Sequence, residues 1–110
     1  MQTKEEIKLR TSVLLATLKG LLGYISVNVR MITIDWSKKH YHIRAYFDRP
    51  TNEDDLDDFQ TVSTEVLAHF PEMTDCKEEV EYSEKPITEL ERLREMVFLR
   101  KGEIEKLNFD

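Results

Sequence analysis

The hydrophobic residues of this chain follow a helical period at first and a strand period later. Between residues 3 and 22 they recur three and four positions apart, and Thr3 followed by Glu6 is a capping-box pattern. These features predict a first helix over residues 3–22. This helix carries more leucines than one buried stripe needs. We therefore expect it to pack across a sheet and to have one of its ends covered by other parts of the chain. The leucines are Leu14, Leu15, Leu18, Leu21 and Leu22.

Residues 29–47 alternate between apolar and polar side chains, which predicts two strands. A two-residue turn at Lys38 and Lys39 would pair them in an antiparallel register in which apolar faces apolar and polar faces polar. One face would pair Trp36 with Tyr41, Ile34 with Ile43 and Ile32 with Ala45, and the other Asp35 with His42, Thr33 with Arg44 and Met31 with Tyr46. The turn lacks the Asn-Gly signal, so a longer loop remains an alternative.

A second helix is predicted over residues 52–70, with Thr51 as its N-cap and Pro71 as its stop. Residues 76–83 alternate again and predict a third strand. Its two faces would carry Val80 and Tyr82 on one side, and Lys77, Glu79 and Glu81 on the other.

The segment after Pro86 fits two interpretations. We expect a loop or short helical turn at 87–92 and then a fourth strand at 94–101, with Val97 and Leu99 pointing inward. A helix over 88–96 is the alternative, because TELERLREM also has helical character. Residues 102–110 contain few apolar residues and form a possible tail.

These elements predict one α+β domain over residues 1–110, in the order α-β-β-α-β-β. Two helices would cover one face of a small antiparallel sheet. The other face would expose a mixture more typical of a binding surface than of a core: Met31, Thr33, Arg44, Tyr46, Lys77, Glu79 and Glu81.

The net charge of −6 is distributed unevenly along the 110 residues. Residues 1–47 carry eight Lys or Arg against three Asp or Glu, whereas residues 48–91 carry three against fifteen. Such an acidic middle repels nucleic acid and attracts a basic protein. We therefore expect a protein partner and no nucleic acid.

The stretch PTNEDDLDDF holds the densest charge. Acids in the first turn of a helix interact favourably with its dipole, which accounts for the carboxylates up to Asp55 but not for Asp57 and Asp58. Helical spacing puts Asp54, Asp57 and Asp58 on one face, either simply solvated or turned to a partner. We predict a partner-binding surface made of Asp54, Asp57, Asp58, Glu78, Glu79 and Glu81, with Tyr46 and Tyr82, and also Phe98, as anchors.

Catalytic and cofactor signatures are missing from the sequence. There is no EF-hand spacing and no phosphate-binding loop, and the single cysteine, Cys76, is expected to be buried. The remaining enzyme hypothesis uses His40 and His42 with Asp35 opposite. We predict a protein that is not an enzyme and has no metal or cofactor. Without a signal peptide or a membrane-spanning run, it is expected to be cytoplasmic.

Several segments resemble small bacterial immunity proteins of polymorphic-toxin and contact-dependent growth inhibition systems: ITIDWSKKHYHIRAYFD, the acidic helix start, TEVLAHFPE and the later strand pair. The resemblance covers roughly residues 24–101. It implies a cytosolic antitoxin that binds the toxic C-terminal domain delivered by a neighbouring cell, and many such toxins are basic nucleases. We therefore expect a nuclease inhibitor, a monomer or weak dimer, that occludes its toxin with an acidic surface. The alternative is a small acidic secretion chaperone or adaptor.

Overall fold

A computed structural model describes residues 2–106 of the chain, with the backbone alone at 104–106. Its elements are α1 (Lys4–Leu21), β1 (Val29–Trp36), β2 (His40–Phe47), α2 (Glu53–Leu67), β3 (Asp75–Tyr82), the 3-10 turn η1 (Ile87–Glu89), β4 (Glu95–Leu99) and α3 (Lys101–Lys106). The α+β class and the order of the first six main elements are confirmed, as is a strand after a short helical turn. The predicted tail begins with α3, and residues 107–110 lie outside the described part.

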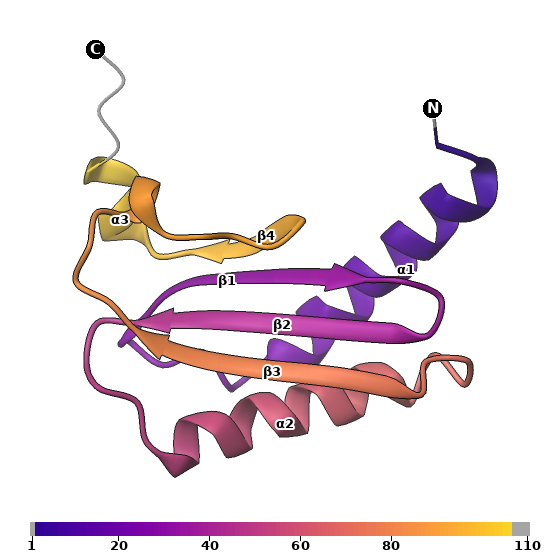
Figure 1. The fold of residues 1–110 in the computed structure, drawn as a ribbon, viewed down its shortest axis with the longest axis horizontal. Helices are drawn as coiled ribbons and strands as arrows, with labels where there is room; N and C mark the ends of the chain where they lie inside the picture. The colour runs from indigo at the N-terminus through magenta and orange to yellow at the C-terminus, as the bar shows by residue number, and fades with distance from the viewer. Residues whose placement is uncertain (1, 107–110) are drawn as a thin grey trace.

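The four strands form one sheet in the order β3-β2-β1-β4 (Figure 1). The β1–β2 hairpin has the predicted register at every pair from Met31 opposite Tyr46 to Trp36 opposite Tyr41. The Ser37 N–H donates to the His40 carbonyl at 2.9 Å, which closes the short turn. Alternation of the side chains was sufficient to fix this register because a slip by one residue would turn the apolar set to solvent.

The sheet is mixed, so the expectation of a wholly antiparallel sheet is wrong for one pair. β3 runs parallel to β2, and both arrows point the same way in Figure 1. The reason is the helix between them: α2 returns the chain along the sheet, so that β3 starts at the same end as β2. The alternation within β3 is the same for either direction and does not reveal which applies.

Both long helices cover one face of the sheet, as predicted, and α1 passes behind the strands in the view of Figure 1. The core between the layers contains Val13 of α1, Ile34 and Ile43 of the hairpin, and Phe59 of α2. The helices approach closely at Gly20, where a Cβ atom would lie 3.4 Å from Val62. This close contact sets α1 and α2 side by side in one layer.

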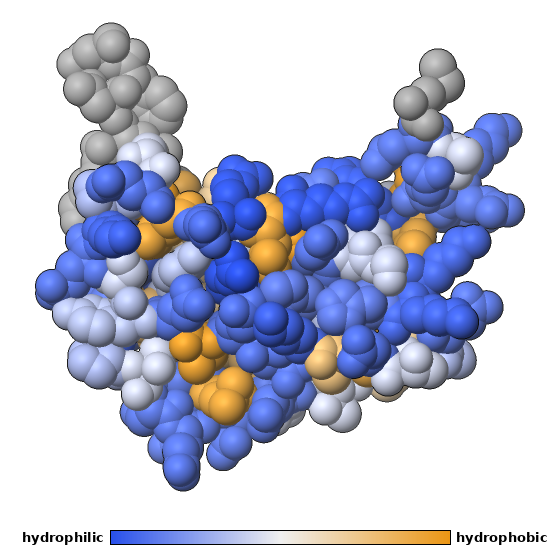
Figure 2. All heavy atoms as spheres, in the orientation of Figure 1, coloured by the Kyte–Doolittle hydropathy of each residue, from blue (hydrophilic) through white to orange (hydrophobic). Residues whose placement is uncertain are grey.

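The opposite face is more covered than expected, although the view of Figure 2 shows mainly hydrophilic residues on it. The connection from β3 to β4 packs against it: the Tyr46 hydroxyl donates to the Glu91 carbonyl at 2.7 Å, and the Leu93 N–H donates to the Thr33 hydroxyl at 3.1 Å. Because β3 and β4 lie at opposite edges, the connection has to pass β2 and β1. The prediction that Met31, Thr33 and Tyr46 are exposed is therefore wrong, since each is at most 5% exposed.

The strand β4 contains a register shift opposite Ile32 and Thr33. As a result Val97 and Phe98 both pack against the core, while Leu99 lies opposite Met31. The expectation for Val97 is confirmed, whereas the inward position of Leu99 is wrong. Phe98, predicted as an anchor, is partly buried against the core.

Candidate functional site

The acidic stretch enters α2 through a capping box. The Asn52 side chain accepts from the Asp55 N–H at 3.0 Å, and the Asp55 carboxylate accepts from the Asn52 N–H at 2.9 Å. The N-cap is therefore Asn52 and not Thr51 as predicted. Arg49 donates to both carboxylate oxygens of Asp55, at 2.6 and 2.9 Å, and this holds the pKa of Asp55 below its usual range. Asp55 is a buried structural acid.

The other acids of α2 have a different environment. Asp54, Asp57 and Asp58 are exposed, and Glu65 continues the same outward face two turns later. No ion pair found in the described part of the chain involves any of the four. We call these four residues the acidic ridge. The structure places the three acids predicted on α2 on one exposed face.

Several arginines of the described chain form close pairs with acids outside the acidic ridge. The pairs are Arg10 with Glu95 at 2.6 Å, Arg30 with Glu103 at 2.8 Å, Arg49 with Asp55 at 2.6 Å and Arg100 with Asp48 at 2.6 Å. These arginines are therefore not available to the acidic ridge. The acidic ridge itself forms no ion pair in the described part of the chain, so its negative charge projects into solvent and acts on an approaching partner.

The acids predicted on β3 are split between the two sides of the strand. Glu79 and Glu81 lie on the face opposite the helices, and Glu78 and Tyr82 lie on the helix side, as the alternation predicts. Hydrogen bonds from His42 and Arg44 outweigh the opposing desolvation and hold the pKa of Glu79 below its usual range. The structure therefore does not bring the β3 acids together with the acidic ridge on one surface.

Tyr46 is not on the surface where the sequence suggested an anchor. Its side chain lies beneath the β3–β4 connection, and desolvation raises the pKa of its hydroxyl. Tyr82 is 43% exposed at the end of the edge strand β3. Of the two predicted tyrosines, Tyr82 alone offers an exposed ring.

The residues of the enzyme hypothesis do not form one unit. Asp35 lies opposite His42 in the register, but it accepts a hydrogen bond from the Trp36 N–H, whereas His42 contacts Glu79 on β3. His40 pairs with Asp75 at 3.1 Å. Within residues 2–106, no three His, Cys, Asp or Glu side chains converge on a position for a metal ion.

Cys76 is exposed on β3, so the expectation that it is buried is wrong. Partial desolvation and a hydrogen bond with Glu78 raise the pKa of its thiol to about 11. The thiol is therefore protonated near neutral pH and is a weak nucleophile.

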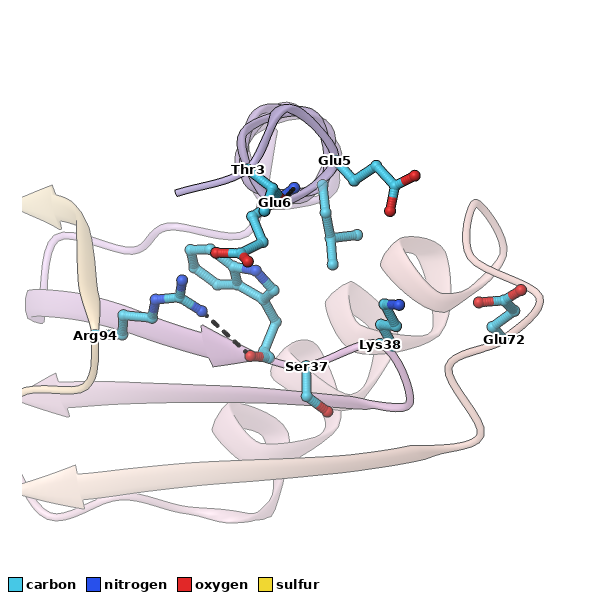
Figure 3. Close-up of a pocket in the computed structure, with 9 residues that line it drawn as sticks. Thr3, Glu5, Glu6, Ser37, Lys38, Glu72 and Arg94 are labelled. Atoms are coloured by element: carbon cyan, nitrogen blue, oxygen red, sulfur yellow. Dashed lines mark hydrogen bonds between the residues drawn. The ribbon is translucent and has the colours of Figure 1, made fainter. Parts of the chain in front are cut away.

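A hollow of about 580 Å³ lies between the start of α1 and the end of the hairpin (Figure 3). The Arg94 guanidinium lies 4.1 Å over the Trp36 ring and donates to the Trp36 carbonyl at 3.4 Å. Glu6 and Lys38 also border the hollow. Charges of both signs border the hollow, and no nucleophile is paired with a base among its lining residues.

Sequence reasoning missed an apolar surface on α1. Leu15, Leu18 and Leu22 are 52%, 49% and 76% exposed, so the expectation that the surplus leucines lie under a covered end is wrong. The signal was the surplus itself, since the core uses a different set of α1 residues, among them Val13 and Leu21. No described helix is long and apolar enough to cross a membrane.

An exposed acidic helix face on an α+β domain is typical of a surface that attracts a basic protein. Comparison with protein families specifies the class: residues 10–102 match the model described as the MafI2 immunity protein, and the chain belongs to this family. It is therefore an immunity protein of a polymorphic toxin system, and such proteins neutralise a toxin. A search of curated proteins finds no match.

Proposed function

We propose that this chain neutralises its cognate toxin by covering a basic substrate-binding surface on the toxic domain, and that the toxin is a nuclease. Asp54, Asp57 and Asp58 would take the places of substrate phosphates on that surface. The protein would act in the cytoplasm without catalysis of its own. The toxin would arrive from a neighbouring cell, as the resemblance to contact-dependent growth inhibition implies.

One observation supports the proposal: the acidic ridge forms no ion pair in the described part of the chain, whereas Arg10, Arg30, Arg49 and Arg100 are bound to other acids. Like charges spaced three and four residues apart on a helix repel one another. Folding gains nothing from Asp57 and Asp58, which lie beyond the first turn. A partner with opposite charge removes the repulsion and associates faster in the field of these carboxylates.

The chemistry of nucleases favours them as the partner. An enzyme that binds nucleic acid uses Lys and Arg to neutralise phosphates, so its substrate groove is basic. A row of carboxylates can enter that groove and exclude the substrate. The acidic ridge and the nucleic acid would both occupy the basic groove of the toxin. Inhibitor and substrate would therefore compete for one site.

The alternative function, a secretion chaperone or adaptor, keeps one supporting observation, the exposed leucines of α1. A chaperone would hold its client without blocking an activity. The match to an immunity family favours neutralisation.

Co-expression tests the proposed function. The C-terminal domain encoded immediately upstream should stop growth when it is produced alone, and this chain should restore growth. Purified chain should also inhibit cleavage of RNA or DNA by that domain at a one-to-one ratio. Restored growth with a toxin that cleaves no nucleic acid would retain the immunity function and contradict the nuclease target. Failure to restore growth would contradict the proposal as a whole.

A further inference from the structure

The outward face of α1 carries a row of apolar side chains. Ile7, Leu15, Leu18 and Leu22 follow at helical spacing, with Thr11 between the first two, and all four apolar residues are about half exposed or more. They leave on the order of 400 Å² of apolar surface in water, which is as large as the biggest patches usual on monomers. We call Leu15, Leu18 and Leu22 the leucine ridge. No fold requirement explains it, because the core takes other α1 residues.

The leucine ridge and the acidic ridge are neighbours. α1 packs on α2 where Gly20 meets Val62, and a groove between α1 and the segment that follows α2 is lined by Leu15 and Lys19 on one side and by His69 and Phe70 on the other. Helical geometry turns the leucine ridge and the acidic ridge away from the sheet, on the outer surface of the same layer. The helix layer thus presents an apolar strip beside an acidic strip.

We propose that this outer surface of the helix layer is the docking surface for the toxin, with the leucine ridge as its apolar anchor. The inference rests on the proposed function and adds to it which face binds and what holds the complex together. Charged residues at the rim set the rate of encounter, whereas buried apolar groups at the centre slow dissociation. The toxin surface would therefore carry an apolar patch bordered by Lys or Arg.

The charges of the layer identify the occupant as a basic protein and not as a second copy of this chain. In a two-fold symmetric dimer the same patch faces itself. The acidic ridges, four carboxylates on each copy, would then share one interface, and the exposed lysines of α1 (Lys4, Lys8 and Lys19), beside Glu5 and Glu6, do not balance them. A basic partner can cover both strips without that repulsion.

The test compares two variants with the wild-type chain in binding to the domain encoded immediately upstream. One variant changes the leucine ridge (Leu15→Ser, Leu18→Ser and Leu22→Ser). The control changes Met96, an exposed residue of the edge strand β4 that is not among the predicted partner-binding residues (Met96→Ser). All four side chains are exposed, so both variants should fold, which circular dichroism would verify. Binding rates are measured by surface plasmon resonance, and the mass of the free chain by sedimentation.

We expect the leucine-ridge variant to dissociate at least about 100-fold faster with a nearly unchanged association rate. The control variant should bind like the wild type, and the free wild-type chain should be a monomer. Equal binding by the leucine-ridge variant, or weaker binding by the control alone, would overturn the docking surface and leave the proposed function intact. If the free wild-type chain were a dimer and the leucine-ridge variant a monomer, the leucine ridge would serve self-association. That result would also overturn the proposed docking surface. A wild-type chain that binds no toxin would contradict the proposed function itself.

Discussion

Arg30 of β1 and Glu103 of α3 form a buried double ion pair although 73 residues separate them. Arg30 Nη2 lies 2.8 Å from Glu103 Oε1 and Arg30 Nε lies 3.1 Å from Glu103 Oε2, and the side chains are 6% and 1% exposed. A further Arg30 N–H donates to the Ser83 carbonyl at 2.7 Å. One guanidinium therefore links β1 to α3 and to Ser83, the residue directly after β3.

Because of this pair, the free energy of unfolding should fall at acid pH. Hydrogen bonds from Arg30 and Arg100 lower the pKa of Glu103 from 4.5 to about 2. A lowered pKa in the folded state means that the carboxylate stabilises the fold fully above about pH 4.5. That contribution is lost as the pH falls from about 4.5 toward 2. Glu103→Gln should lower the free energy of unfolding at pH 7 by about 3 kcal/mol, because Arg30 remains buried without its counterion.

Urea denaturation from pH 7 to pH 2.5 would measure this effect, with the exposed Glu89→Gln as control. The wild type should lose stability below about pH 4.5, and Glu103→Gln should show a flatter dependence. Equal stability of the two variants at pH 7 would contradict the structural role of the pair.

Asp55 and Asp57 provide a comparison within the acidic stretch itself. Asp55→Asn should destabilise the chain by about 2 kcal/mol, because it weakens the bond to Arg49 and the capping box. Asp57→Asn removes the same charge and should change stability by no more than about 0.5 kcal/mol. Thermal unfolding of both variants checks this. Equal losses would show that the acids of α2 do not divide into a structural and a free group.

Ser63 offers a prediction of increased stability. Its side chain is fully buried in α2, and its hydroxyl has no hydrogen-bond partner among the described residues. Ser63→Ala should raise the free energy of unfolding by about 1 kcal/mol, because an unsatisfied buried hydroxyl is costly and alanine favours helix. The control is Thr64→Ala on the exposed side of the same turn. A destabilised Ser63→Ala would mean that the hydroxyl is satisfied in solution.

The sequence predicted those features that depend on periodicity. The hairpin register follows from alternation, and the exposed acids of α2 follow from helical spacing, so both agree with the structure. The direction of β3, the burial of Tyr46 and the break in β4 depend on which strands become neighbours. A pattern of polar and apolar residues gives the faces of an element, not its partners. An apolar residue that binds a partner has the same sequence pattern as one that packs in the core. For that reason the exposed leucines of α1 were predicted to be covered.

We propose that the exposed carboxylates of α2 recognise a basic toxin, and this claim predicts a strong salt dependence of the association rate. The variant Asp54→Lys, Asp57→Lys and Asp58→Lys would be compared with Glu6→Lys, Glu84→Lys and Glu89→Lys, which change the net charge equally at exposed sites outside α2. Stopped-flow mixing with the upstream-encoded domain at low and high salt gives the rates. The α2 variant should associate about 100-fold more slowly at low salt and lose most of its salt dependence, while the control stays close to the wild type. Unchanged rates and an unchanged salt dependence in the α2 variant would contradict the claim.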